Sequence, residues 1–171
     1  MKHICLFGGA GVGKSTIASG LFYEMKTRNL SVEYLTEYAK GIVYKKDFTT
    51  LQDQLLITAT QHHPWTCVKK DFSINDGAFL LGCIYGKESE HFPKNLFDEL
   101  IIQMFKSYDT VNYFLVPDFD HYEQNGRIET KQESEEISAK ILNLLIENTI
   151  PFKTLKSNKD SVKEILLDLG L

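Results

Sequence analysis

The sequence GGAGVGKS, which runs from Gly8 to Ser15, has the pattern G-x-x-x-x-G-K-S. This pattern is typical of a P-loop, a glycine-rich turn that binds the phosphates of a nucleotide. Residues 3–7 form a short apolar run suited to a buried strand, and apolar side chains recur at helical spacing after Ser15. A chance glycine turn before a helix is the alternative, and it is much less favoured because all parts of the motif occur in the required order. The sequence therefore predicts a strand, a P-loop and a helix.

The residue types of this loop suit phosphate chemistry. Glycines let the backbone curl so that successive N–H groups point at phosphate oxygens, and the helix N-terminus adds unpaired donors. We expect Lys14 to reach the β- and γ-phosphates of ATP and the Ser15 hydroxyl to ligate Mg²⁺, with Thr16 as a second hydroxyl. The predicted cofactor-binding residues are Gly8, Gly9, Ala10, Gly11, Val12, Gly13, Lys14, Ser15 and Thr16.

The composition is that of one globular domain. The chain has 171 residues, 43% hydrophobic and 25% charged, which suits a single domain over residues 1–171. A net charge of -4 gives no broad basic surface, which makes a nucleic-acid partner less favoured without excluding DNA. The cysteines are far apart and odd in number, so neither a disulfide framework nor a zinc site is predicted. Without a signal peptide or a membrane-length apolar run, we expect a cytoplasmic protein with no membrane partner; the oligomeric state stays open.

Strand-like and helix-like segments alternate along the chain. This alternation predicts an α/β fold with three layers, in which helices cover both faces of a mostly parallel five-stranded sheet. The expected strands are 3–7, 31–36, 71–75, 111–116 and 152–155, and the expected helices are 14–28, 37–44, 51–62, 79–85, 94–106, one that a capping box at Thr130 and Glu133 begins, and a final one around 162–169. The polar, irregular segment 118–130 is predicted to be a small lid.

Two acidic residues follow predicted strands, at the sheet edge where ligands bind in such folds. Asp76 ends the third strand and suits the acid that holds Mg²⁺ in P-loop proteins, although Asp76-Gly77 is also an ordinary turn dipeptide. Glu37 ends the second strand and is a candidate to accept a proton from an incoming hydroxyl. A glutamate stabilised by the dipole of the following helix is an equal alternative for Glu37.

Arg127 is the candidate for neutralising charge in a transition state. The chain holds two arginines, and Arg28 lies at the solvent end of the first predicted helix. Arg127 lies in the segment after the fourth strand, and a planar guanidinium suits a phosphoryl group that is losing its bond. The alternative is a loop arginine paired with a nearby acid such as Asp118 or Glu129.

Two glutamines lie seven residues apart on the helix predicted from Leu51, and an amide can bind the edge of a base. We favour an ordinary surface position for Gln61 and leave Gln54 open. The cluster His62, His63 and Trp65 has no partner acid or metal-ligand spacing and receives no assigned role.

Several short motifs together resemble a known family. They are the P-loop, Thr36-Glu37-Tyr38-Ala39-Lys40, Gln54 with Gln61, Asn75-Asp76, Tyr85-Gly86-Lys87-Glu88 and Gly126-Arg127-Ile128-Glu129. In this order they are similar to the small P-loop kinases related to the ribosylnicotinamide kinase domain of NadR, including phage-encoded relatives. The chain departs from them after Gln61, with His-His-Pro-Trp, and after Asp76, where Gly77-Ala78 replaces the usual Ser-Pro.

The resemblance implies an ATP- and Mg²⁺-dependent kinase with a parallel sheet and a lid. It places Glu37 near the acceptor, Asp76 near the metal and Arg127 in the lid. Lys14, Glu37, Asp76 and Arg127 are thus the candidate catalytic residues, and Ser15 and Asp76 the candidate metal ligands.

The leading functional hypothesis is transfer of the ATP γ-phosphoryl group to a nucleoside- or nucleotide-like acceptor. Some phage relatives phosphorylate hydroxymethylated pyrimidines in DNA, so a DNA kinase is an alternative. An NTP-hydrolysing switch or ATPase module is a third hypothesis of another class. Such a module usually carries a water-activating residue beside the metal acid, where this chain has Gly77 and Ala78.

Overall fold

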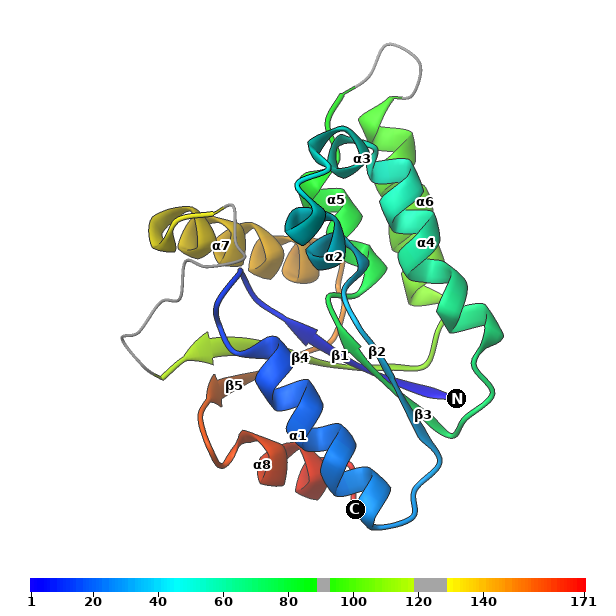
Figure 1. The fold of residues 1–171 in the computed structure, drawn as a ribbon, viewed down its shortest axis with the longest axis vertical. Coiled ribbons are helices and arrows are strands. Elements are labelled where there is room, and N and C mark those ends of the chain that lie inside the picture. The colour runs from blue at the N-terminus through cyan, green and yellow to red at the C-terminus, as the bar shows by residue number, and fades with distance from the viewer. Residues whose placement is uncertain (89–92, 119–128) are drawn as a thin grey trace.

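The fold is built on a parallel β-sheet. The computed structural model describes residues 1–88, 93–118 and 129–171. Within these ranges the strands are β1 (Lys2–Phe7), β2 (Val32–Leu35), β3 (Phe72–Asp76), β4 (Thr110–Pro117) and β5 (Lys153–Ser157). All pairings are parallel and the order is β2-β3-β1-β4-β5 (Figure 1). The predicted five-stranded sheet is confirmed.

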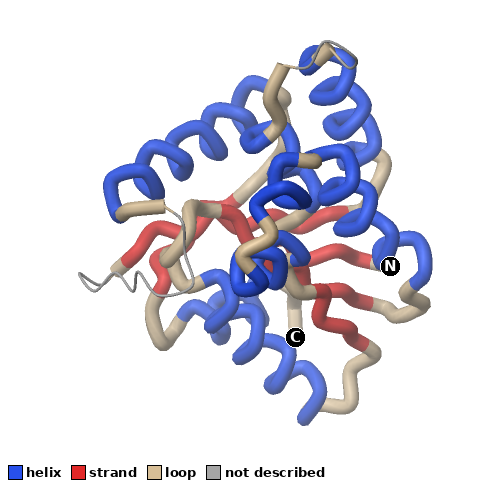
Figure 2. The backbone as a smooth tube through the Cα atoms, turned by 45° about the horizontal axis from the view of Figure 1, so that its top comes forward, coloured by secondary structure: helices blue, strands red, loops and turns tan. Residues whose placement is uncertain are grey.

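Helices cover both faces of this sheet, as Figure 2 shows from a second direction. The helices are α1 (Lys14–Thr27), α2 (Tyr38–Lys45), α3 (Phe48–Gln52), α4 (Gln54–Cys67), the 3-10 helix η1 (Phe79–Leu81), α5 (Gly82–Tyr85), α6 (Lys94–Lys106), α7 (Lys131–Glu147) and α8 (Ser161–Asp168). Helices α1 and α8 pack on one face, whereas α4, α5, α6 and α7 pack on the other. The three-layer α/β prediction is therefore correct.

Strand β1 lies in the middle of the sheet and explains the apolar run before the P-loop. Its side chains alternate between two cores: Ile4 and Leu6 pack with α1 and α8, while Cys5 and Phe7 pack with the opposite layer. All four residues are fully buried. A strand covered on both faces needs apolar residues at consecutive positions, which is why its sequence shows no polar alternation.

The helix predicted over residues 51–62 differs from the observed one. The structure has two helices, and Asp53 separates them because its carboxylate accepts the backbone N–H of Leu56 at 2.9 Å and so caps α4. Helix α4 then continues beyond His62, through Pro64, to Cys67. Proline removes one helical hydrogen bond, but Trp65 in the same turn is buried in the core and packs the helix end against it.

Residues His62 and Trp65 belong to a buried aromatic cluster rather than to a site. Trp65 stacks on His3 with ring centroids 4.0 Å apart, and His62 Nε2 lies 2.7 Å from the hydroxyl of Tyr108. The Ser73 hydroxyl lies 2.8 Å from His3 Nδ1. These contacts give the residues a structural role in joining β1, α4 and the end of α6. His63 is exposed outside the cluster.

Stability is expected to fall at acidic pH through His3. Burial lowers its pKa from 6.5 to about 4, with the N-terminal charge as a smaller cause. His3 therefore binds a proton near pH 6.5 in the unfolded chain but only near pH 4 in the folded protein. The free energy of unfolding is highest above pH 6.5 and decreases as the pH falls toward 4. Urea unfolding of the wild-type protein and His3→Gln across this window tests the effect. The wild-type midpoint should fall more steeply; parallel curves would show that His3 does not titrate in this way.

The helices of the described ranges are too short or too polar to cross a membrane.

Candidate functional site

The P-loop connects β1 to α1 in a conformation that needs glycine. Gly8, Gly11 and Gly13 have φ angles of 139°, 81° and 93°, in a region that other residues rarely adopt. Gly13 is also the N-cap of α1, so the loop leads directly into the helix N-terminus. The glycine pattern found in the sequence thus has a backbone cause at three of its positions.

Lys14 lies against the inside of this loop. Its ammonium donates to the carbonyl oxygens of Gly8 at 2.9 Å and Gly9 at 2.8 Å. The neighbouring Ser15 hydroxyl accepts a hydrogen bond from Lys40 Nζ at 3.4 Å, which brings α2 to the mouth of the loop. Lys40 is a cation that residue-by-residue sequence reasoning did not single out, although it lies within the Thr36–Lys40 motif.

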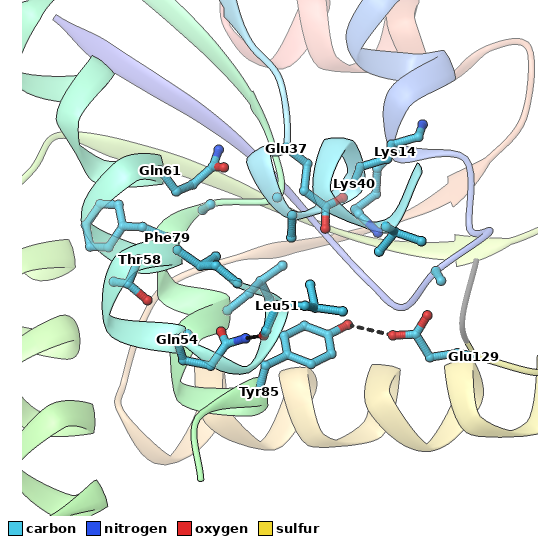
Figure 3. Close-up of a pocket in the computed structure, with 18 of the residues that line it drawn as sticks. Lys14, Glu37, Lys40, Leu51, Gln54, Thr58, Gln61, Phe79, Tyr85 and Glu129 are labelled. Atoms are coloured by element: carbon cyan, nitrogen blue, oxygen red, sulfur yellow. Dashed lines mark hydrogen bonds between the residues drawn. The ribbon is translucent and has the colours of Figure 1, made fainter. Parts of the chain in front are cut away.

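A cavity of about 540 Å³ extends from the P-loop to α4 and α5 (Figure 3). Lys14, Ser15, Thr16 and Glu37 line one part of it, together with the loop glycines. The remaining wall combines apolar side chains with amide, hydroxyl and charged groups; it includes Val43, Phe48, Leu51, Gln54, Ile57, Thr58, Phe79, Leu81, Tyr85, Lys87 and Glu129. The cavity therefore joins a phosphate-binding end to an end suited to a flat, partly polar ligand.

Asp76 lies next to the P-loop because β3 pairs directly with β1. The register places Asp76 opposite Leu6, two residues before Gly8. The carboxylate is buried: Oδ2 accepts from the Tyr34 hydroxyl at 3.2 Å, and Oδ1 has no hydrogen-bond partner in the part of the chain that the structure describes. Burial, followed by the charge of Asp76, raises the pKa of Tyr34 to about 12, so Tyr34 remains a donor.

The unpartnered oxygen of Asp76 fits a role in holding hydrated Mg²⁺. Residues 1–88, 93–118 and 129–171 contain no cluster of three or more histidine, cysteine or acidic side chains that could form a complete metal site. Mg²⁺ bound with substrate phosphates needs one or two protein groups and retains several waters. The Ser15 hydroxyl and an acid behind it match that smaller requirement.

Glu37 lies between β2 and α2, at the N-cap position of α2. The Glu37 side chain makes no capping hydrogen bond. It lies beside Gly77, which has a φ of 88° and leaves room for Glu37 because it lacks a Cβ atom. A Cβ atom on residue 77 would lie 3.0 Å from Glu37 Cγ. Burial raises the pKa of Glu37, the charge of Lys14 lowers it, and Asp76 raises it. The Glu37 carboxyl group therefore lies close enough to Lys14 and Asp76 for their charges to change its pKa.

Gln61 is buried, and the expectation of a surface position was wrong. Its Oε1 accepts the backbone N–H of Tyr38 at 2.6 Å, and its Nε2 donates to the carbonyl oxygen of Thr36 at 3.1 Å. The amide thus binds the backbone on both sides of Glu37 and fixes where that residue points. Trp65, one turn later on α4, is also buried, and this shared face was the available sequence signal.

Two further polar residues lie on the cavity wall formed by α4. Gln54 donates from Nε2 to the carbonyl oxygen of Leu51 at 2.9 Å. The Thr58 hydroxyl is buried, and no described group forms a hydrogen bond with it. Thr58 was not selected from the sequence, because a single threonine within a helix has no distinctive pattern.

Part of the predicted site lies outside the described residues. Arg127 and most of the predicted lid, residues 119–128, belong to this part. Glu129, immediately after it, lines the cavity and accepts a hydrogen bond from the Tyr85 hydroxyl at 3.5 Å (Figure 3). The predicted capping box follows and is confirmed at Thr130 and Glu133. Arg28 pairs with Glu24 on the exposed face of α1, away from the cavity.

The chain has the same fold as two solved structures. Structures of the deoxyadenosine kinase from M. mycoides, one with bound dATP and one with the products dCMP and a flexible dCDP, each align with a TM-score of 0.58. The first is 17% identical and the alignment covers 99% of both chains; the second is 15% identical over 99% of this chain and 98% of the other. At 15–17% sequence identity, this structural similarity shows that the chain shares the fold of the two structures.

Comparison with curated proteins finds no match. A family model described as an AAA domain, however, matches residues 3–164. This range begins in β1, contains the P-loop and all the remaining strands, and ends within α8. The chain therefore belongs to the family described as an AAA domain.

Proposed function

We propose that this protein is an ATP- and Mg²⁺-dependent kinase that transfers the γ-phosphoryl group to a nucleoside- or nucleotide-like acceptor. The observation that carries the proposal is the continuous cavity that connects the P-loop, through Glu37, to the wall formed by α4, η1 and α5. A phosphoryl donor and an acceptor have to meet in line within one site. Glu37 lies at the boundary between the two ends.

The donor end would hold the ATP phosphates on the P-loop backbone and Lys14. Bound Mg²⁺, ligated by Ser15 and held through water by Asp76, would neutralise charge on the phosphates. Glu37 would accept the proton of an attacking hydroxyl, and its raised pKa makes it a stronger base than an exposed glutamate. We assign Arg127, in the proposed lid, to the equatorial oxygens of the transferred group.

The acceptor end suits a nucleoside. Phe79 and Ile57 provide apolar surface, while Gln54 and Thr58 provide groups that can bind the polar edge of a base. The structures with the same fold belong to an enzyme that is a deoxyadenosine kinase, which supports this class of acceptor. A hydroxymethylated pyrimidine in DNA has similar chemistry and is the second candidate.

A labelled-phosphate screen tests the proposal. Purified protein is incubated with γ-labelled ATP, Mg²⁺ and one acceptor at a time: ribonucleosides, deoxynucleosides, their monophosphates, nicotinamide riboside and hydroxymethylated DNA. We expect label on at least one free nucleoside or nucleotide. Label on DNA alone would select the second candidate, and release of free phosphate without a labelled acceptor would favour an ATPase.

Replacing Asp76 by asparagine is expected to raise the Mg²⁺ concentration needed for half-maximal activity by about 10–100-fold. Metal-free ATP binding should change much less, because Asp76 would act on the metal rather than on phosphate. Titration of ADP formation with Mg²⁺, beside ATP binding in EDTA, measures both effects. Asp71→Asn is the matched control, because Asp71 is an exposed acid that directly precedes the first residue of β3, at the end of the strand opposite Asp76. An unchanged Mg²⁺ curve would reduce Asp76 to a turn residue.

A further inference from the structure

Helix α7 is bonded to the P-loop through two serines. The backbone N–H of Gly9 donates to Ser138 Oγ at 2.8 Å, and the hydroxyl of Ser134 donates to the carbonyl oxygen of Ala10 at 2.5 Å. The two serines are one helical turn apart and so share one face of α7. Figure 1 shows α7 beside the loop that follows β1. Gly9 and Ser134 are buried, whereas Ala10 and Ser138 are half-buried, so both bonds are partly shielded from solvent.

The close approach of α7 explains why residue 9 is glycine. Gly8, Gly11 and Gly13 have positive φ angles, but Gly9 does not. A Cβ atom on residue 9 would instead lie 2.2 Å from the backbone oxygen of Ser134, a distance that no side chain tolerates. Residue 9 is therefore fixed as glycine by contact with α7 rather than by the turn itself.

The first half of the P-loop is thus held from two sides. On the inside, Lys14 binds the carbonyl oxygens of Gly8 and Gly9; on the outside, Ser138 and Ser134 bind Gly9 and Ala10. Lys14 is also the residue that would contact the β- and γ-phosphates. Once its ammonium is directed to phosphate, the serines on α7 remain to fix the orientation of the Gly9–Ala10 peptide groups.

We propose that Ser134 and Ser138 are positioning residues that keep the P-loop in its phosphate-binding shape while Lys14 engages the nucleotide. The inference rests on the proposed function, because it takes ATP as the ligand of the loop. Neither serine touches the nucleotide. Loss of either hydroxyl removes the partner of one backbone group of the loop, either the N–H of the buried Gly9 or the carbonyl of the half-buried Ala10. The ordered array of N–H donors is then no longer fixed before ATP arrives.

Nucleotide binding by serine variants tests the proposal. We expect Ser138→Ala and Ser134→Ala each to weaken binding of a fluorescent ATP analogue by roughly 10-fold. The melting temperature should fall by only a few degrees, because the higher helix propensity of alanine offsets part of the lost hydrogen bond. Ser138→Thr, which keeps a hydroxyl, should restore most of the affinity. Ser107→Ala, which removes a hydroxyl at the end of α6, is the control and should bind like wild type. Equal affinities for the wild-type protein and both alanine variants would overturn the proposal.

Hydrogen exchange in the nucleotide-free protein separates this inference from the proposed function. The Gly9 amide should exchange slowly in the wild-type protein and at least 10-fold faster in Ser138→Ala, while the Leu21 amide within α1 should be unaffected. Unchanged Gly9 exchange in Ser138→Ala would overturn the positioning role of the serines, whatever the protein binds. If the wild-type protein does not bind ATP but Gly9 exchanges faster in the variant, the proposed function is wrong and the positioning role stands. Binding of triphosphate ion then tests whether the loop holds another phosphate ligand.

Discussion

Replacing Lys14 by alanine is expected to lower phosphoryl transfer by at least about 10²–10³-fold while the protein stays folded. Removing one well-placed donor to a charge that develops in the transition state typically costs this much. The side chain lies in the P-loop and its ammonium contacts loop carbonyls rather than either apolar core. The free energy of unfolding should therefore change little.

Steady-state ADP formation and urea unfolding measure the two effects. Lys26→Ala, an exposed position at the other end of α1, is the matched control and should retain activity. Turnover near the wild-type rate in folded Lys14→Ala protein would refute a kinase mechanism at this loop.

Replacing Glu37 by glutamine is expected to remove transfer to a hydroxyl acceptor and to spare the slow hydrolysis of bound ATP by water. The loss in kcat should be about 10²–10⁴-fold, as is typical when a general base is removed. Glutamine keeps the shape of the side chain, so KM for the acceptor should change little. The loss could approach the lower limit because loose phosphoryl transfer needs little early deprotonation.

The pH profile gives a second readout for Glu37. Burial raises its pKa above the usual value for glutamate, so the base form, and with it kcat, should increase with pH through that raised value. Glu37→Gln should lose this acidic limb. Glu33→Gln, which replaces an acid within the preceding strand β2, should keep it. Equal loss of transfer and hydrolysis in Glu37→Gln would assign Glu37 to the fold or to the metal.

Much of the fold was predictable because its signals are local. The apolar run of β1 reflects burial on both sides. Helix α6 was predicted with its observed bounds, Lys94–Lys106, because apolar residues recur along it at helical spacing. The break at Asp53 was missed because a single capping carboxylate outweighed the periodicity that continues across it. The continuation of α4 through Pro64 was missed because core packing of Trp65 overrides the local effect of proline.

In the candidate site, too, the features with local sequence signals were predictable, and those that depend on distant contacts were not. Convergence of the P-loop, Glu37 and Asp76 follows from parallel strands, whose carboxyl ends share one edge of the sheet. Contacts between distant segments leave no local pattern in the sequence. The face that Gln61 shares with Trp65 indicates burial but not its bonds to the backbone around Glu37, and the α7 serines contact a loop more than 120 residues earlier in the chain. The catalytic role of Arg127 stays a prediction from the sequence.

Acceptor-dependent formation of ADP by the wild-type protein tests the central claim most directly. With Mg²⁺-ATP alone, ADP should form slowly; adding the acceptor found in the labelled-phosphate screen should accelerate it by at least about 10²-fold, because a positioned hydroxyl reacts faster than water. The proposed kinase predicts one phosphorylated acceptor for each ADP formed. ADP formation at one rate with every acceptor, with only free phosphate as the second product, would contradict the account and identify an ATPase.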